Sequence, residues 1–201
     1  MSLFKENPKT IFENIKELLS IGAKDRNHSF HTPVFSTNFD NNSINSRIVV
    51  LRKFDQDQLI LIFNTDYRSP KIIELKKNNK SNFVFYDAKI KIQLRISTLT
   101  KIHYNNEITL EAWEQTRLFS RKCYLTQKAP SSITNIAEDG IPEHLKGIDP
   151  TKDESEMGYK NFTVIENLIQ EIDWLYLASS GHRRLKISLN DYNPIFEWLI
   201  P

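Results

Sequence analysis

The 201-residue sequence contains one cysteine, Cys123, and carries a net charge of only +2. A single cysteine excludes an internal disulfide and every metal site built from several cysteines, and it is typical of a reducing compartment. The small excess of basic residues, dispersed among acids, does not indicate nucleic-acid binding. No apolar run has the length of a membrane span, and none follows a charged start as in a signal peptide. These absences predict a cytoplasmic protein with no membrane and no nucleic-acid partner.

The remaining composition is ordinary for a globular protein, with 39% hydrophobic and 26% charged residues. The length suffices for one sizeable core, so we expect a single domain over residues 1–201. The five histidines follow no metal-ligand spacing, which predicts no metal site. Residues 128–159 form the only long irregular stretch. A loop of that size is functional, disordered or an oligomer contact, and its role stays unassigned.

Hydrophobic periodicity predicts two long helices. Residues 8–23 place apolar side chains at helical spacing on one face. Residues 107–124 return to the same spacing after a series of strands. The inward positions expected for this second helix are Ile108, Leu110, Trp113 and Leu118.

Alternating patterns predict the strands. Residues 90–98 place Ile92 and Leu94 on one face and Gln93 and Arg95 on the other, which is typical of a half-buried antiparallel strand. Five or six antiparallel strands with helices at the side indicate a mainly β (α+β) fold, a β-barrel with flanking helices, rather than a parallel α/β sheet. Further extended segments are expected at residues 30–37, 81–87, 162–178 and 182–189, with a turn at residues 40–43.

Residues 47–78 contain the clearest candidate site, because they predict strand, turn, strand, basic loop and helix in succession. Ser69 is suited to cap the helix, Pro70 to its first position, and Lys71 lies in the first turn. A hairpin through residues 55–58 is expected to return Arg47 to the end of the second strand, near Thr65 and Lys71. Two cations, two hydroxyls and a helix N-terminus would together bind a phosphate.

This block resembles the pyridoxamine 5'-phosphate oxidase-like FMN-binding split-barrel family. The family's signature of an arginine, apolar residues and a basic residue corresponds to residues 47–52, RIVVLR. Its aromatic–polar–threonine strand end corresponds to residues 63–65, FNT, and its Ser-Arg-Lys helix start to residues 69–71, SPK. Its Phe-Tyr and Arg-Gln-Val-Arg strands correspond to residues 85–86 and 92–95. The resemblance implies an FMN-binding split β-barrel with flanking helices, and a homodimer with FMN at the interface.

The resemblance also implies a role for each matching residue. Arg47, Ser69 and Lys71 would bind the FMN phosphate, and Thr65 would add a hydroxyl. The chain departs from the family at Pro70, where the oxidases have arginine. The flavin ring would lie beside Val50, Leu51, Arg52, Asn64 and Gln93.

A second set of basic residues is a weaker match to the oxidases' substrate-phosphate site. Arg121 resembles one substrate-phosphate arginine. Arg183 and Arg184 lie where the family has a C-terminal Arg-x-His motif, but their spacing differs. We therefore regard these three residues as candidate substrate ligands and leave open whether pyridoxamine 5'-phosphate is oxidised.

The family resemblance implies an FMN-dependent oxidoreductase acting on a small molecule, in which a substrate amine or alcohol gives a hydride to the flavin and oxygen accepts the electrons. One alternative is a flavin or quinone reductase, or a stress-related flavoprotein, without pyridoxamine phosphate oxidase activity. Another is a non-enzymatic FMN-binding or haem-binding module. The sequence does not identify the substrate or the electron acceptor.

Overall fold

The computed structural model describes residues 6–40, 43–190 and 193–201. These residues form nine strands in one sheet, and every strand pair is antiparallel. The strands are Val34–Asp40 (β1), Ser43–Ile48 (β2), Lys53–Asp55 (β3), Ile60–Asp66 (β4), Lys80–Asp87 (β5), Ile92–His103 (β6), Phe162–Tyr176 (β7), Arg183–Asn190 (β8) and Asn193–Leu199 (β9).

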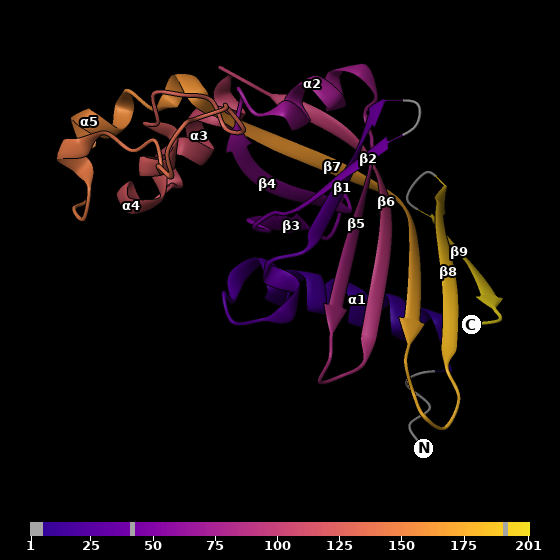
Figure 1. Ribbon diagram of the computed structural model, residues 1–201. Helices are drawn as coiled ribbons and strands as arrows, with labels where there is room; N and C mark the ends of the chain where they lie inside the picture. The colour runs from indigo at the N-terminus through magenta and orange to yellow at the C-terminus, as the bar shows by residue number, and fades with distance from the viewer. Residues whose placement is uncertain (1–5, 41–42, 191–192) are drawn as a thin grey trace.

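The α-helices flank this sheet (Figure 1). They are Pro8–Lys24 (α1), Pro70–Lys77 (α2), Glu107–Gln115 (α3), Leu118–Arg121 (α4) and Lys152–Glu156 (α5). Short 3-10 turns occupy Ser29–His31, Lys122–Tyr124, Glu143–Leu145 and Tyr159–Asn161. Among the described residues, no helix combines the length and apolar character needed to cross a bilayer.

The expected class is confirmed, because an antiparallel sheet with helices at its side dominates the fold. The expectation of five or six strands was too low. The strand order is β2-β1-β5-β6-β7-β4-β3, and β8 and β9 continue from β7. Within the described residues the sheet does not close on itself, so the barrel is split.

Strand β7 divides the sheet into two parts. Its first half, Phe162–Leu168, pairs with β4, and its second half, Glu171–Tyr176, pairs with β8. The register with β6 shifts between Ser97 and Thr98, where the first half gives way to the second. Such a bulge increases the local twist. Helices α3 to α5 therefore gather at one end of β7 and strands β8 and β9 at the other (Figure 1).

The main core lies between α1 and the inner face of the sheet. Helix α1 buries Ile11, Ile15 and Leu19, as its periodicity predicted. Phe35 lies 4.8 Å from both Phe63 and Phe83, measured between ring centroids. The aromatic rings thus join β1, β4 and β5 into one packed layer.

One glycine is required where α1 meets the next turn. A Cβ atom on Gly22 would lie 2.7 Å from the Cβ of Phe30. The carbonyl of Gly22 also lies 2.7 Å from Nδ1 of His31. This close approach explains the 3-10 turn at Ser29–His31, in a segment where the sequence indicated an extended chain from residue 30.

The expected helix over residues 107–124 is interrupted, and two of its inward positions were wrong. Trp113 is buried, whereas Ile108 is 39% and Leu110 is 48% exposed. The side chain of Arg121 donates to the carbonyls of Trp113 and Thr116, which would otherwise continue the helix ladder. A tertiary contact therefore ends α3 and starts a separate α4.

Two further expectations differ in detail. The turn between β5 and β6 extends to residue 91, so Ile90 lies in the turn and is exposed instead of continuing the apolar face. The expected turn at residues 40–43 includes Asn41 and Asn42, which lie outside the described residues.

Candidate functional site

Arg47 reaches the predicted anion site by a different route from the one expected. It lies in β2, which pairs with β1 rather than with β4, and its register partner is Phe35. The hairpin with β4 is formed instead by β3. Arg47 nevertheless lies close enough to Lys71 to perturb its ionisation. The expected hairpin through residues 55–58 is present, but Arg47 lies outside it and reaches the helix that carries Lys71 from β2, through Glu74.

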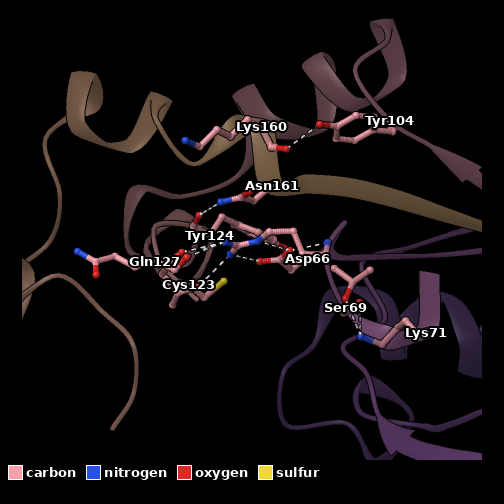
Figure 2. A network of polar contacts seen from close by, with 12 residues as sticks. Asp66, Ser69, Lys71, Tyr104, Cys123, Tyr124, Gln127, Lys160 and Asn161 are labelled. Carbon is pink, nitrogen blue, oxygen red and sulfur yellow. Dashed lines mark hydrogen bonds and ion pairs between the residues drawn. The ribbon is translucent and has the colours of Figure 1, made fainter. Parts of the chain in front are cut away.

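Lys71 is the centre of a compact polar cluster at the start of α2. Its Nζ donates to Oγ1 of Thr65 at 2.9 Å and to Oγ of Ser69 at 3.1 Å. Figure 2 shows Lys71 turned toward Ser69. Ser69 precedes α2 but makes no side-chain cap contact, so its hydroxyl is directed to Lys71. The sequence correctly grouped Thr65, Ser69 and Lys71.

Glu74, a buried residue of α2, holds Arg47 beside this cluster. Nη2 of Arg47 lies 3.0 Å from Oε2 of Glu74, and Nη1 of Arg47 donates to Oγ1 of Thr37. Asn45 donates to the other carboxylate oxygen at 2.7 Å. Burial alone would raise the pKa of Glu74, but the bonds from Thr37, Asn45 and Arg47 outweigh it and lower that pKa. Glu74 is therefore a permanent anion that orients Arg47.

The electrostatic balance of the cluster favours an added anion. Burial lowers the pKa of Lys71, and the positive charge of Arg47 lowers it further. The contacts of Lys71 are neutral hydroxyls. The carboxylates of Asp66 and Glu74 offset part of this pKa shift, but a phosphate would add a negative charge in direct contact with Lys71, at a helix N-terminus where backbone N–H groups also favour it. The donor set therefore fits a phosphate group.

Arg68 is not part of this cluster although it lies in the same loop. Its guanidinium binds both carboxylate oxygens of Asp66, at 3.0 and 2.7 Å. It also donates to the carbonyl and hydroxyl of Thr126, each at 3.0 Å. Figure 2 shows this network beside the cluster, between Asp66 and the segment carrying Tyr124 and Gln127. Arg68 thus attaches the segment after α4 to the loop before α2.

An exposed backbone edge leads away from the cluster along β4. Among the described residues, β3 pairs only with Ile60–Ile62, so the next four residues of β4 have β7 on one side and no paired strand on the other. Opposite this edge, Val49 donates to Pro33 at 3.1 Å and Leu51 to His31 at 2.9 Å. In an extended chain the intervening Val50 N–H points the other way. The family resemblance predicts the flavin ring beside these backbone groups.

A groove of about 480 Å³ lies beyond that edge, between β4, β7 and helices α3 and α4. Two predicted flavin-site residues, Arg52 and Asn64, line it. Arg117 and Ser120 line the same groove but escaped the sequence prediction, because a continuous helix over residues 107–124 gave no reason to select them. Basic side chains outnumber acidic ones in the lining, which also includes Lys24, Arg26, Lys53, Glu111 and Glu166.

Gln93 lies far from the cluster within one chain. It pairs with Tyr86 and Leu175, while the strand position nearest the cluster is Ser81, the partner of Thr37. Five residues of β5 separate these two positions, which is about 17 Å along a strand. The structure therefore does not bring Gln93 to the phosphate cluster of the same chain.

Arg121 is buried and its donors are occupied. It contacts Glu156 at 2.7 Å, Ser155 at 3.1 Å and the carbonyls of Trp113 and Thr116, and it lies over the Trp113 ring. These partners assign it a structural role between α3, α4 and α5.

Arg183 and Arg184 lie at the start of β8, at the other end of the molecule from α4 (Figure 1). Arg184 binds Asp173 with two bonds, at 3.1 and 2.7 Å, and Arg95 binds the same carboxylate. Arg183 donates to the carbonyls of Gly181 and His182. The three candidate substrate arginines thus do not form one site within the chain.

A protein-family model matches part of the chain. Residues 13–104 match the family described as pyridoxamine 5'-phosphate oxidase, FMN-binding domain. These residues, which include the phosphate cluster, are therefore similar to that family's FMN-binding domain. No curated protein sequence matches the chain.

Solved structures share the fold at low sequence identity. A pyridoxamine 5'-phosphate oxidase-related, FMN binding protein from Nostoc punctiforme PCC 73102 is 18% identical, with a TM-score of 0.75 over 100% of both chains. PhzG from Burkholderia lata 383, solved with tetrahydrophenazine-1-carboxylic acid, is 15% identical, with a TM-score of 0.73 over 100% of this chain and 97% of that chain. These similarities confirm the split-barrel fold with flanking helices.

Proposed function

We propose that the protein binds FMN and acts as an FMN-dependent oxidoreductase on a small anionic molecule. The observation that carries the proposal is the position of Lys71, between the hydroxyls of Thr65 and Ser69 and beside Arg47. This donor set would bind the cofactor phosphate. The family match covers all four residues.

The flavin ring would extend from the cluster along the free edge of β4. Leu51 is 1% exposed and its N–H donates to the His31 carbonyl, so it would pack behind the ring. Val50 would contribute backbone groups, while Arg52, whose N–H donates to the Ile62 carbonyl, and Asn64 would reach the ring with their side chains from the groove. Backbone N–H and C=O groups suit the alternating donors and acceptors of a flavin.

The groove beside Arg52 would hold the substrate against the ring. Its basic lining, which includes Arg52 and Arg117, favours a carboxylate or phosphate. PhzG, which shares the fold, was solved with a carboxylic acid. Bound FMN would accept a hydride, while the protein would orient the substrate and exclude water from the groove.

The separation of Gln93 from the phosphate cluster supports a homodimer with FMN at the interface. If Gln93 contacts FMN, it comes from the partner subunit. Strand β2 also exposes Ile44 and Ile48, which are 74% and 61% accessible and adjoin Arg47. A second subunit would cover these apolar side chains.

The test compares FMN with riboflavin, which lacks the phosphate. We expect the purified protein to show flavin absorption and to bind FMN more tightly than riboflavin. Arg47→Ala should reduce FMN affinity and leave riboflavin affinity unchanged. Lys77→Ala, an exposed lysine at the far end of α2, is the control. Equal affinity for both flavins in the wild-type protein would refute the phosphate assignment.

A further inference from the structure

The lining of the groove includes a carboxylate that is hydrogen-bonded to a buried residue outside the lining. Glu166, on β7, has an exposed side-chain fraction of 23%, and its Oε2 lies 2.6 Å from Nε2 of His103 on β6. The His103 side chain is 3% exposed. Glu166 lines the groove together with Arg52, whereas His103 lies behind it.

A third residue fixes which atom of His103 donates. Asn106 caps α3, and its Oδ1 accepts from the backbone N–H of Thr109 at 3.1 Å. Its Nδ2 is therefore the atom that faces Nδ1 of His103, at 3.3 Å. Because the Asn106 amide donates to Nδ1 of His103, that ring nitrogen is the acceptor. The ring proton therefore lies on Nε2, which faces Glu166. The helix cap thus orients the histidine that orients the carboxylate.

Glu166 is not neutralised by the many cations around it. Within the described part of the chain it forms no ion pair with lysine or arginine, although Lys101 is its register partner on β6. Its Oε1 has no hydrogen-bond partner among these residues. The groove therefore presents a fixed carboxylate oxygen from β7, together with Arg117 at the start of α4 and Arg52 just before β3.

We infer that Glu166, positioned by His103 and Asn106, binds an ammonium or similar cationic donor of the groove's ligand, opposite the arginines that bind its acidic group. This inference rests on the proposed function, because it assigns a specificity residue to the same groove. A ligand that carries both an ammonium group and an acidic group complements Glu166 as well as the arginines. A ligand with only the acidic group leaves Glu166 desolvated without a partner, which is unfavourable.

The experiment uses two probes that differ in one substituent. Pyridoxamine 5'-phosphate carries an aminomethyl group where pyridoxine 5'-phosphate carries a hydroxymethyl group. Isothermal titration calorimetry at pH 7 measures the affinity of the FMN-loaded protein for each. We expect the wild-type protein to prefer the amine by about tenfold or more, as for one charge-assisted bond.

Glu166→Gln should abolish this preference, because it keeps the shape and the hydrogen bond while removing the charge. Glu114→Gln, which removes an exposed carboxylate of α3 outside the groove, should retain it. His103→Leu should weaken the preference, and His103→Gln, whose amide can still donate to Glu166, should restore part of it. If the His103 variants do not fold, Glu166→Gln by itself tests the role of Glu166 in the preference for the amine.

The flavin absorption of each variant separates this inference from the cofactor assignment. Loss of FMN binding in the wild-type protein refutes the proposed function. Normal FMN binding with equal affinity for the two probes, no binding of either, or a preference that survives in Glu166→Gln refutes the role of Glu166.

Discussion

Replacing Lys71 by methionine tests the anion site most directly, because the change removes the charge and nearly preserves the length. In the free protein Lys71 contacts only the hydroxyls of Thr65 and Ser69, at 2.9 and 3.1 Å. A bound phosphate would convert it into a charge-assisted donor. Such a bond contributes about 1.5–3 kcal/mol, so Lys71→Met should weaken FMN binding about 10- to 150-fold.

The affinity follows from fluorescence titration of FMN and riboflavin at fixed ionic strength, with Lys77→Met as the matched control. Riboflavin affinity should not change, because riboflavin brings no phosphate to the cluster. Equal weakening of both flavins would show that Lys71 acts on the ring or on folding. Unchanged FMN affinity would refute the reasoning altogether.

The pH dependence of binding has a defined sign. Burial, followed by the charge of Arg47, lowers the pKa of Lys71 below 10.5 in the free protein. A phosphate stabilises the ammonium and raises that pKa again, so binding takes up a proton once the free lysine has lost its own. FMN affinity should be constant from about pH 7, where the phosphate is a dianion, up to the lowered pKa of Lys71, and should fall as the pH rises through that pKa. Lys71→Met should show no such decline.

The same shift predicts the effect of Lys71 on stability. A lysine with a lowered folded-state pKa destabilises the fold while it is charged in the folded protein, and this cost disappears as the pH rises toward the unfolded value of 10.5. Lys71→Met should therefore leave the cofactor-free protein no less stable at pH 7. A large decrease in its melting temperature would contradict the view that Lys71 serves binding.

Three other variants or measurements test the surrounding structure. Arg47→Ala leaves Glu74, 2% exposed, without its cation and should reduce the free energy of unfolding by about 2–3 kcal/mol in urea titrations, with partial recovery in Arg47→Ala/Glu74→Gln. Arg121→Ala should reduce the free energy of unfolding by about 2–4 kcal/mol without changing FMN affinity, because Arg121 contacts structural partners. An unchanged urea midpoint together with loss of substrate binding would instead support its predicted role as a substrate ligand. Sedimentation velocity should show a homodimer, and a monomer that binds FMN tightly would contradict the shared site.

Local patterns predicted much of the fold because they depend on neighbouring residues alone. Helix α1 and the alternating faces of β6 follow directly from hydrophobic spacing. The break between α3 and α4 could not be predicted in this way. It depends on Arg121 reaching the carbonyls of Trp113 and Thr116, while α5 supplies Glu156. Because the pattern predicted one continuous helix over residues 107–124, the inward positions expected at Ile108 and Leu110 were wrong.

The sequence predicted which residues form the anion site but not which strand pairing brings them together. The sequence grouped Thr65, Ser69 and Lys71 because they lie within one strand and the adjoining helix start. It could not show that β2 would pair with β1, because strand pairing depends on long-range contacts. The groove was harder still, since Arg52, Arg117 and Glu166 come from three distant segments and meet only in the folded chain.

The phosphate cluster and the groove lie on alternate faces of β4, and this arrangement constrains any ligand that joins them. Thr65 points toward Lys71, whereas its neighbour Asn64 and, two residues earlier, Ile62 point into the groove. A molecule bound through its phosphate at Lys71 can reach the groove only by passing the strand edge that β3 leaves unpaired. A phosphate followed by a flexible polyol and a planar ring satisfies this geometry. The short length of β3 is therefore as important to the proposed site as the basic residues themselves.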